Sequence, residues 1–340
     1  MIVQALADVL EGRSLTRDRA REVMAEVMAG GATPAQIGGF LVALRAKGET
    51  ADEIAGFAEA MRDHAVRVAP RRSDLVDTAG TGGDGARTLN ISTAAALVAA
   101  AAGAAVAKHG NRAVSSASGS ADVLEALGFD LELPPERIAR SIDELGFGFM
   151  FAPSHHPAMR HAAPVRRELA TRTVFNVLGP LTNPAGARAQ VVGVYSPGLV
   201  RTIADVLALL GARRAFVVHG AFGVDELSPA GPNLVCEVVD GRVHEREIDP
   251  LELGIPRCAP SELRGGSPEE NAAAIRAVFS GEEQGARRDA ILLNAAGAIA
   301  AAGHADDLHD GLELAREALE SDAAAGRLEA LARFSRGESR

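Results

Sequence analysis

Cysteine is scarce in this sequence, which has only Cys236 and Cys258 among its 340 residues. Neither their spacing nor the chain length calls for a disulfide framework or a cysteine-based zinc site. We therefore expect both thiols to be reduced and to serve packing. The chain also lacks a block of basic residues, and its formal net charge is -10. Such a charge repels phosphate backbones at long range, so nucleic acid is not an expected partner.

Long apolar segments are missing as well. The strongest membrane candidate is residues 94–107, which carry no charged or polar side chain, but a spanning helix needs roughly 20 residues. The amino terminus has Asp8 and Glu11 within its apolar pattern and no basic leader, so it does not resemble a secretory signal. We expect a buried helix over 94–107, no membrane partner and a cytoplasmic location.

The composition is that of a soluble globular protein, with 47% hydrophobic and 24% charged residues. The chain is long enough for two compact units. Within the first 68 residues, Thr33-Pro34-Ala35-Gln36 and Thr50-Ala51-Asp52-Glu53 have the form of helix caps, each followed by apolar residues at helical spacing. We predict a small all-helical domain over residues 1–68, completed by a segment that returns within residues 155–185.

After Pro70, short β-type runs alternate with alanine-rich helical stretches. The predicted strands lie at 74–78, 104–108, 147–151, 189–195, 214–219 and 233–239, and the predicted helices at 92–102, 121–127, 135–145, 199–210, 268–279 and 288–302. Such alternation is typical of a parallel sheet covered on both faces, with ligands at the carboxyl ends of the strands. The expected fold class is α/β: a small all-helical domain plus a large α/β domain over 70–340 with a mainly parallel central sheet.

A glycine-rich loop, G-T-G-G-D-G at 80–85, lies between a predicted strand and a helix that starts near Ser92. Glycines permit positive φ and close approach of backbone N–H groups to a ligand, and the helix start adds partial positive charge. Standard dinucleotide and P-loop fingerprints are absent. A tight turn explains one or two glycines but not the polar residues Asp84, Thr88, Asn90, Ser92 and Thr93. The loop therefore predicts a phosphate or pyrophosphate site.

Two further clusters follow predicted strands. K-H-G-N-R at 108–112 precedes a hydroxyl-rich stretch, 115–120, at a second helix entrance, and it suits an anion site or a solvated turn equally well. Asp225 and Glu226 follow a later strand, where adjacent carboxylates are as often solvated as functional. Beside a pyrophosphate site they gain a purpose, because Mg²⁺ takes carboxylate ligands while it bridges phosphate oxygens.

A fourth cluster holds His155, His156 and His161. Three histidines suggest zinc, but no cysteine pair or H-E-x-x-H motif supports it. Arg166 follows, and an arginine here could clamp a substrate carboxylate in bidentate fashion. A solvated helix face shared with Glu168 explains its spacing equally well.

In combination, these stretches resemble one family, the anthranilate phosphoribosyltransferases of tryptophan biosynthesis. The matching motifs are A-T-P-A-Q-I-G-G-F-L-V-A-L-R-A-K-G-E-T at 32–50, G-T-G-G-D-G at 80–85, T-L-N-I-S-T at 88–93, K-H-G-N-R at 108–112, S-G-S-A-D-V-L-E-A-L-G at 118–128, H-H-P-A-M-R-H-A-A-P-V-R-R-E-L at 155–169, R-T-V-F-N-V-L-G-P-L-T-N-P-A at 172–185 and D-E-L-S at 225–228. The resemblance runs from about residue 15 to at least residue 300.

The resemblance implies the fold shared by nucleoside phosphorylases and phosphoribosyltransferases, a homodimer formed through the small domains, and Mg²⁺ bound with the donor, phosphoribosyl pyrophosphate. The implied reaction passes the phosphoribosyl group to the amine of anthranilate and releases pyrophosphate. Implied donor-binding residues are Gly80, Gly83, Asp84, Thr88, Asn90, Ile91, Ser92, Thr93, Lys108 and Ser120. Anthranilate-binding positions are Gly80, Asn111, His156 and Arg166, metal-associated positions are Ser92, Asp225 and Glu226, and catalytic roles fall to Asp84, Lys108 and His109.

Two alternatives remain. A pyrimidine nucleoside phosphorylase of similar architecture is disfavoured, because Asp225, Glu226 and the 108–112 cluster suit a metal-bound pyrophosphate. A non-catalytic relative that binds nucleic acid should carry a basic groove, whereas this chain has a net charge of -10.

An aryl amine is neutral at pH 7, so the reaction needs no strong base, and the sequence identifies none.

Overall fold

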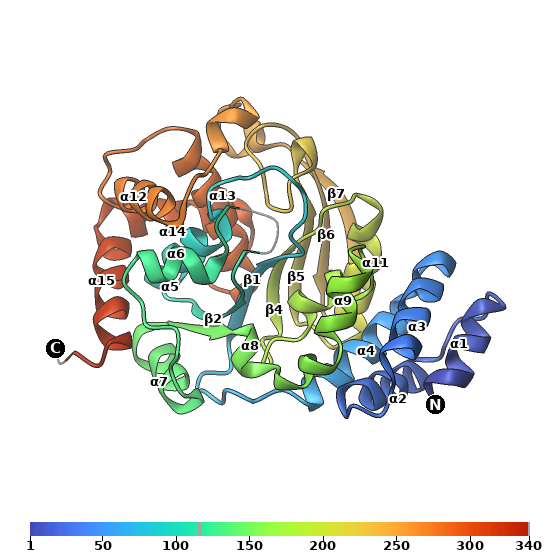
Figure 1. Ribbon diagram of the computed structural model, residues 1–340. Coiled ribbons are helices and arrows are strands. Elements are labelled where there is room, and N and C mark those ends of the chain that lie inside the picture. The colour runs from blue at the N-terminus through green and yellow to red at the C-terminus, as the bar shows by residue number, and fades with distance from the viewer. Residues whose placement is uncertain (114–116, 339–340) are drawn as a thin grey trace.

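The computed structural model describes residues 1–113 and 117–338, so Ser115 and Ser116 of the hydroxyl-rich stretch lie outside the described residues. Within these ranges, one sheet has the strand order β3-β2-β1-β4-β5-β6-β7 (Figure 1). The strands are β1 (Leu75–Gly80), β2 (Ala105–Gly110), β3 (Phe147–Phe151), β4 (Ala189–Gly193), β5 (Arg214–His219), β6 (Asn233–Val239) and β7 (Arg242–Ile248). The first five are parallel, and β6 and β7 are antiparallel.

The predicted mainly parallel sheet is therefore confirmed, and the order of its strands locates the expected ligand site. From β1 the chain builds outward to β2 and β3 on one side and to β4 and β5 on the other. At such a reversal the connections leave the sheet in opposite directions and open a crevice at the carboxyl ends of the strands. The ends of β1 and β4 lie at this point, where Gly80 is paired with Gly193.

Both faces of the sheet are covered, which is why its central strands read as apolar runs. The covering helices are α5 (Ile91–Ala101), α6 (Ser120–Ala126), α7 (Pro135–Leu145), α11 (Gly198–Leu209), α12 (Pro268–Phe279), α13 (Ala286–Ala302), α14 (Leu308–Glu320) and α15 (Ala323–Ser335). Val191 of β4 belongs to the core under α5 and α13, whereas Val192 belongs to the core under α11. All the helices predicted for this part are present, and β7, α14 and α15 are additional to the prediction.

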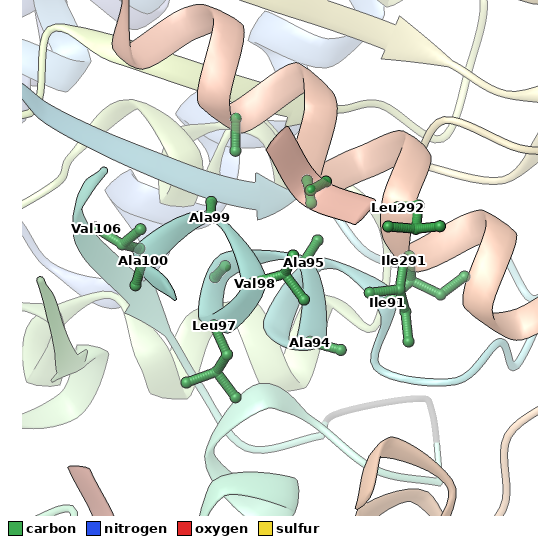
Figure 2. Close-up of a cluster of buried hydrophobic side chains, with 14 of the residues drawn as sticks. Ile91, Ala94, Ala95, Leu97, Val98, Ala99, Ala100, Val106, Ile291 and Leu292 are labelled. Atoms are coloured by element: carbon green, nitrogen blue, oxygen red, sulfur yellow. The ribbon is translucent and has the colours of Figure 1, made fainter. Parts of the chain in front are cut away.

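Helix α5 corresponds to the first part of the apolar run noted in the sequence. The expected helix over 94–107 is wrong at its end, because α5 ends at Ala101 and residues 105–107 belong to β2. Its side chains, from Ile91 through Ala100, pack against Val106 of β2 and against Ile291 and Leu292 of α13 (Figure 2). Because half of these side chains are alanine, α5 and α13 approach each other and the sheet closely. This packing fixes the amino-terminal end of α5 at the carboxyl edge of β1.

No helix in the described ranges combines the length and the apolar character that a bilayer crossing requires.

The amino-terminal helices are α1 (Ile2–Leu10), α2 (Arg17–Met28), α3 (Pro34–Lys47) and α4 (Ala51–Asp63). Both predicted capping boxes are present: Thr33 accepts from the Gln36 amide, and Thr50 accepts from the Glu53 amide, each at 3.3 Å. Gly48 ends α3. The four helices share a core with α11 and with side chains of the 155–185 segment, such as Val165 and Phe175.

The 155–185 segment consists of short pieces that connect the helices to the sheet. These pieces are α8 (Ala152–His155), η1 (Pro157–His161), α9 (Ala163–Leu169), α10 (Phe175–Leu178) and η2 (Gly179–Leu181). Later connections contain η3 (Ala221–Gly223), η4 (Pro250–Leu253) and η5 (Pro260–Leu263). Helix α9 lies beside α3. A Cβ atom added to Gly38 of α3 would be in van der Waals contact with the Val165 side chain of α9.

Candidate functional site

Asp225 lies directly over the crevice at the ends of β1 and β4. A Cβ atom added to Gly80 would overlap the Asp225 carboxylate, and one added to Gly193 would overlap the Asp225 backbone carbonyl. The two paired glycines are therefore required by close approach of the chain after β5. The sequence predicted Gly80 and Asp225 as site residues separately, and the structure brings them together.

The glycine-rich loop is anchored at its start. The Thr81 amide donates to the Gly193 carbonyl at 2.9 Å, and the Gly82 amide donates to Asp225 Oδ2 at 2.6 Å. Gly82, Gly83 and Gly85 have φ angles of +67°, +76° and +75°, which favour glycine. In contrast, the amides of Gly83, Asp84 and Gly85 have no hydrogen-bond partner among the described residues. These N–H groups can bind an anion.

Glu226 ties the start of α5 to the same place. The Ser92 amide donates to Glu226 Oε1 at 2.9 Å, and the Thr88 hydroxyl approaches Oε2 at 3.4 Å. The Ser92 carbonyl accepts a hydrogen bond from the Thr78 hydroxyl at 3.0 Å. A carboxylate thus satisfies one of the free amides at this helix start, where the helix dipole favours negative charge.

Carboxyl groups crowd this site. Burial, reinforced by the negative charge of Asp84, raises the pKa of Asp225 to about 7. Burial and the charge of Asp225 raise the pKa of Glu226 well above its usual range. The Asp225 amide also approaches Asp84 Oδ2 at 3.4 Å. A cation bound beside these carboxyl groups would relieve their mutual repulsion.

A divalent ion would nevertheless need further ligands here. In residues 1–113 and 117–338, no three His, Cys, Asp or Glu side chains are grouped so that they could hold an ion by themselves. Mg²⁺ is typically bound by one or two carboxylates together with water and substrate phosphate oxygens. Asp225 and Glu226, with the Ser92 hydroxyl nearby, fit that partial donor set.

Lys108 is a buried cation whose charge interacts with that of Glu226. It lies on β2 with 2% of its surface exposed, and its Nζ donates to the Thr78 carbonyl at 2.5 Å and approaches the Thr78 hydroxyl at 3.1 Å. Burial lowers the pKa of Lys108 to about 8, although the charges of Asp77 and Glu226 oppose the shift. The ammonium group therefore keeps its proton at neutral pH and loses it around pH 8 unless an anion binds beside it.

His109 and His156 form a buried pair. Their ring centroids are 5.0 Å apart, and Nε2 of each ring is buried without a hydrogen-bond partner among the described residues. Burial lowers the pKa of His109 to about 3 and that of His156 to about 4. His109 Nδ1 faces the Gly179 carbonyl at 3.3 Å. Because a carbonyl only accepts, this contact assigns the proton to Nδ1 and leaves Nε2 as an acceptor.

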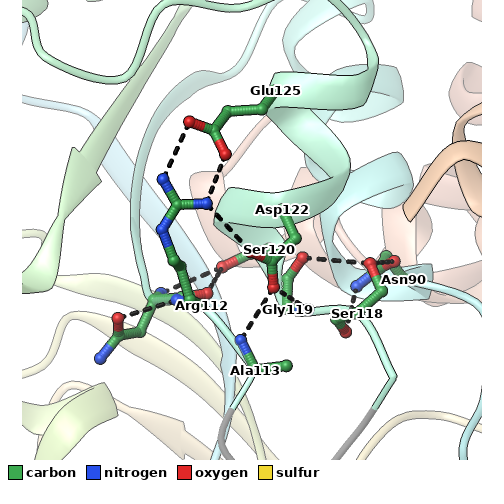
Figure 3. A network of polar contacts seen from close by, with 9 residues as sticks. Asn90, Arg112, Ala113, Ser118, Gly119, Ser120, Asp122 and Glu125 are labelled. Atoms are coloured by element: carbon green, nitrogen blue, oxygen red, sulfur yellow. Dashed lines mark hydrogen bonds and ion pairs between the residues drawn. The ribbon is translucent and has the colours of Figure 1, made fainter. Parts of the chain in front are cut away.

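The loop after β2 has a polar network of its own (Figure 3). The Asn111 amide donates to Ser120 Oγ at 3.2 Å, and Arg112 pairs with Asp122 and Glu125 of α6. The Asn90 side chain donates to the Ser118 carbonyl at 3.1 Å and accepts from Asn271 at 2.8 Å. Ser120, Asn111 and Asn90 are thus held at the entrances of α6 and α5.

Arg166 lies apart from these groups on α9. Its guanidinium carbon is 5.2 Å from the centroid of the Phe175 ring, and the side chain is half-buried. Within the described residues it has no hydrogen-bond or ion-pair partner, and burial lowers its pKa. An unpaired cation in a partly buried position suits a substrate carboxylate. Glu168 on the same helix forms no ion pair with Arg166 in the described residues, so the solvated helix face stays open as an alternative.

Two of the predicted donor-binding residues face the core. Ile91 and Thr93 are 2% and 1% exposed, so contact with a ligand would have to use their backbone groups.

Sequence reasoning missed Asp77 and Asn183, which position the 108–112 cluster. Asp77 accepts from the His109 amide at 3.2 Å and from Asn183 Nδ2 at 2.7 Å, and Asn183 also donates to the Ala107 carbonyl at 2.8 Å. Burial raises the pKa of Asp77 to about 6. Two signals in the sequence could have identified them: Asp77 is a charged residue inside an otherwise uncharged strand, and Asn183 is a polar residue of T-N-P-A at 182–185.

Comparison with known proteins agrees with this geometry. Residues 72–325 match the glycosyl transferase family, a/b domain, and residues 3–65 match the glycosyl transferase family, helical bundle domain. An anthranilate phosphoribosyltransferase of Rubrobacter xylanophilus is 55% identical over 99% of this chain and 98% of its own length.

Solved structures give the same result. Anthranilate phosphoribosyltransferase from Thermus thermophilus has a TM-score of 0.93 at 52% identity, covering 98% of this chain and 99% of that one. The enzyme from Saccharomyces cerevisiae in complex with PRPP and Mg has a TM-score of 0.91 at 28% identity, covering 99% and 98%.

Proposed function

The chain belongs to the anthranilate phosphoribosyltransferase family, and from this premise we propose which of its residues carry the reaction. The reaction transfers the phosphoribosyl group of phosphoribosyl pyrophosphate to the amine of anthranilate in tryptophan biosynthesis and releases pyrophosphate. The observation that carries the proposal is the crevice at the ends of β1 and β4, where the Gly82 and Ser92 amides bind the Asp225 and Glu226 carboxylates and the next loop amides stay unpaired.

We propose that the donor binds along the glycine-rich loop and the start of α5. The unpaired amides of Gly83, Asp84 and Gly85 and the Lys108 ammonium suit its phosphate oxygens. The further donor-binding residues are Gly80, Thr88, Asn90, Ile91, Ser92, Thr93 and Ser120. Because Ser92 shares a hydrogen bond with Glu226, the donor and the metal would meet at this residue.

Mg²⁺ is the cofactor that fits the acidic pair. Asp225, Glu226 and the Ser92 hydroxyl would hold it, with pyrophosphate oxygens completing its coordination. When bound, it supplies positive charge that stabilises the departing pyrophosphate.

The acceptor site is proposed to include Arg166, Asn111, His156 and Gly80. Arg166 is unpaired and half-buried, so its guanidinium can take the anthranilate carboxylate in bidentate fashion. Asn111, held through Ser120 at the end of β2, would orient the amine.

The chemistry consists of anchoring and charge stabilisation. As the bond from the anomeric carbon to the pyrophosphate oxygen breaks, positive charge grows on the ribose and negative charge grows on the leaving oxygen. Lys108 and the loop amides stabilise the leaving group, and Asp84 holds the loop against Asp225. His109 is neutral, with an unpaired Nε2, and can accept the proton that the amine loses once the new carbon–nitrogen bond forms.

We also propose that the chain divides into a helical domain, residues 1–68 with a returning segment within 155–185, and an α/β domain, residues 70–340. The helical domain would form a homodimer, since Val3, Leu10 and Val42 of α1 and α3 expose 61%, 69% and 47% of their surface. Light scattering after gel filtration tests this, and Val42→Glu should give monomers. A cytoplasmic location is supported by two free cysteines.

Loss of anthranilate fluorescence tests the activity. The signal should fall when phosphoribosyl pyrophosphate and Mg²⁺ are both present and should persist when either is omitted. Activity with thymidine and phosphate instead would favour the nucleoside phosphorylase alternative, and a salt-dependent gel shift without transfer would favour nucleic-acid binding.

A further inference from the structure

Arg172 connects three parts of the molecule. Its Nη2 donates to the Gly83 carbonyl in the glycine-rich loop, and its guanidinium carbon lies 3.8 Å from the centroid of the Tyr195 ring. Its backbone carbonyl accepts from the guanidinium of Arg45 on α3. Among the described residues, no carboxylate forms an ion pair with Arg172. The side chain is exposed, so its position depends on the stack with Tyr195 and on the bond to Gly83.

Tyr195 holds the same loop by a second route. Its backbone amide donates to Thr81 Oγ1 at 3.1 Å, while its ring carries the arginine that binds Gly83. Gly82 between them is held by Asp225 at 2.6 Å. Three consecutive loop residues are therefore tethered, each to a different group.

The tether at Gly83 sets the direction of the next amide. Because the peptide unit is planar and trans, the Gly83 carbonyl and the Asp84 N–H point in opposite directions. With the carbonyl drawn toward Arg172, the Asp84 N–H faces away from Arg172 and has no partner in the described part of the chain. Gly83 has a φ of +76°, which favours glycine, and an added Cβ would lie 3.2 Å from Arg172 Nη2, so the guanidinium would have to shift slightly.

We propose that Arg172, seated on Tyr195, is a positioning residue for donor binding that orients the Gly83–Asp84 peptide so that its N–H is presented to the pyrophosphate. The proposal rests on the donor site described above. Arg45 of α3 binds the Arg172 carbonyl, so Arg172 also connects the glycine-rich loop to α3. Donor binding then depends on the position of α3 relative to the loop.

The test compares Arg172→Ala and Tyr195→Leu with Tyr195→Phe, which keeps the ring, and with Arg167→Ala, which removes an exposed cation of α9 that forms no hydrogen bond with the loop in the described residues. Arg172→Ala and Tyr195→Leu should each raise the KM for phosphoribosyl pyrophosphate roughly tenfold, because a charged hydrogen bond that orders the loop is lost. The KM for anthranilate should stay unchanged. The double variant should be no worse than Arg172→Ala alone, since both changes break one tether.

Hydrogen exchange in the ligand-free protein gives a readout that does not depend on catalysis. Amides of residues 82–86 should exchange faster in Arg172→Ala and Tyr195→Leu, and at the wild-type rate in Tyr195→Phe and Arg167→Ala. Should Arg172→Ala fail to fold, Tyr195→Leu carries the test.

Unchanged exchange, an unchanged donor KM, or an equal rise in KM with Arg167→Ala would overturn the proposal. If the wild-type protein showed no transfer, the proposed function would fall. The exchange measurement would then still decide whether the tether exists.

Discussion

The backbone amide of Ser92 donates to Glu226 Oε1 at 2.9 Å, although 134 residues separate the two in sequence. This bond places a carboxylate at the amino-terminal end of α5, where free helix amides and the dipole favour an anion. Burial and the charge of Asp225 raise the pKa of Glu226. Glu226 is thus held at the helix start where we propose that the metal-bound pyrophosphate binds.

Glu226→Gln should separate the two roles of this side chain. Glutamine keeps an oxygen that accepts from the Ser92 amide, so the denaturation midpoint should not fall, but it loses the charge that binds Mg²⁺. We expect kcat/KM to fall roughly 100-fold and the Mg²⁺ concentration for half-maximal activity to rise. Asp225→Asn should act in the same way.

A Mg²⁺ titration of activity, with Asp205→Asn as control, checks this prediction. Asp205 is an acidic residue of α11 that pairs with Arg201 on the surface. A wild-type titration curve for Glu226→Gln would show that this carboxylate takes no part in metal binding.

The pH dependence of donor capture should reflect Lys108. Burial lowers its pKa to about 8, so the ammonium is charged below that pH and increasingly neutral above it. Since only the charged form attracts pyrophosphate, kcat/KM for the donor should decline above about pH 8. The corresponding decline in kcat should begin at a higher pH, because bound pyrophosphate raises the pKa of Lys108.

Lys108→Arg provides the check, since arginine stays protonated throughout this range. This substitution should lower kcat/KM at every pH and abolish its decline above about pH 8. A decline that persists in Lys108→Arg would assign the ionisation to another group.

Local patterns made much of the fold predictable. The capping boxes at Thr33 and Thr50 and the alternation of strands and helices depend on neighbouring residues, and the structure has them. Strand β7 was missed because it lies at the edge of the sheet and reads R-V-H-E-R-E-I. The signal was Asp240-Gly241, with φ of 46° and 78°, which suits the two-residue turn of a hairpin.

The site was predictable only where its residues are contiguous. The glycine-rich loop could be assigned to phosphate because its glycines and the helix start are adjacent in sequence. The bond from Ser92 to Glu226, the place of Gly193 under Asp225 and the stack of Arg172 on Tyr195 could not be inferred, since each depends on how distant segments pack.

Arg166→Ala should weaken acceptor binding alone. The guanidinium has no partner in the described residues and stacks on Phe175, so its loss should leave the fold intact. We expect the KM for anthranilate to rise roughly tenfold to 100-fold, the range for a charged hydrogen bond to a carboxylate, with little change in the donor KM.

Aniline as acceptor sharpens the Arg166 test, because it has the amine without the carboxylate. Wild-type protein and Arg166→Ala should use aniline equally poorly, and Arg167→Ala should resemble wild type with anthranilate. If Arg166→Ala impaired both acceptors alike, the guanidinium would have a role other than binding the carboxylate.

Gly193→Ala should displace the Asp225 carboxylate, which we propose binds the metal. A Cβ at this position would overlap the Asp225 backbone carbonyl, so either β4 or the chain after β5 must shift. Overpacking of this kind costs about 1–3 kcal/mol, and it should displace Asp225 from the Gly82 amide that it now accepts from at 2.6 Å. The denaturation midpoint should therefore fall, and the Mg²⁺ concentration for half-maximal activity should rise.

Gly198→Ala is the matched control, since an added Cβ there meets nothing within 4 Å and the residue begins α11. It should leave both measurements at or slightly above wild type, because alanine reduces the freedom of the unfolded chain. If Gly193→Ala lowered the midpoint but left the Mg²⁺ titration unchanged, Asp225 would tolerate displacement. Its place over the two glycines would then matter for packing and not for the metal.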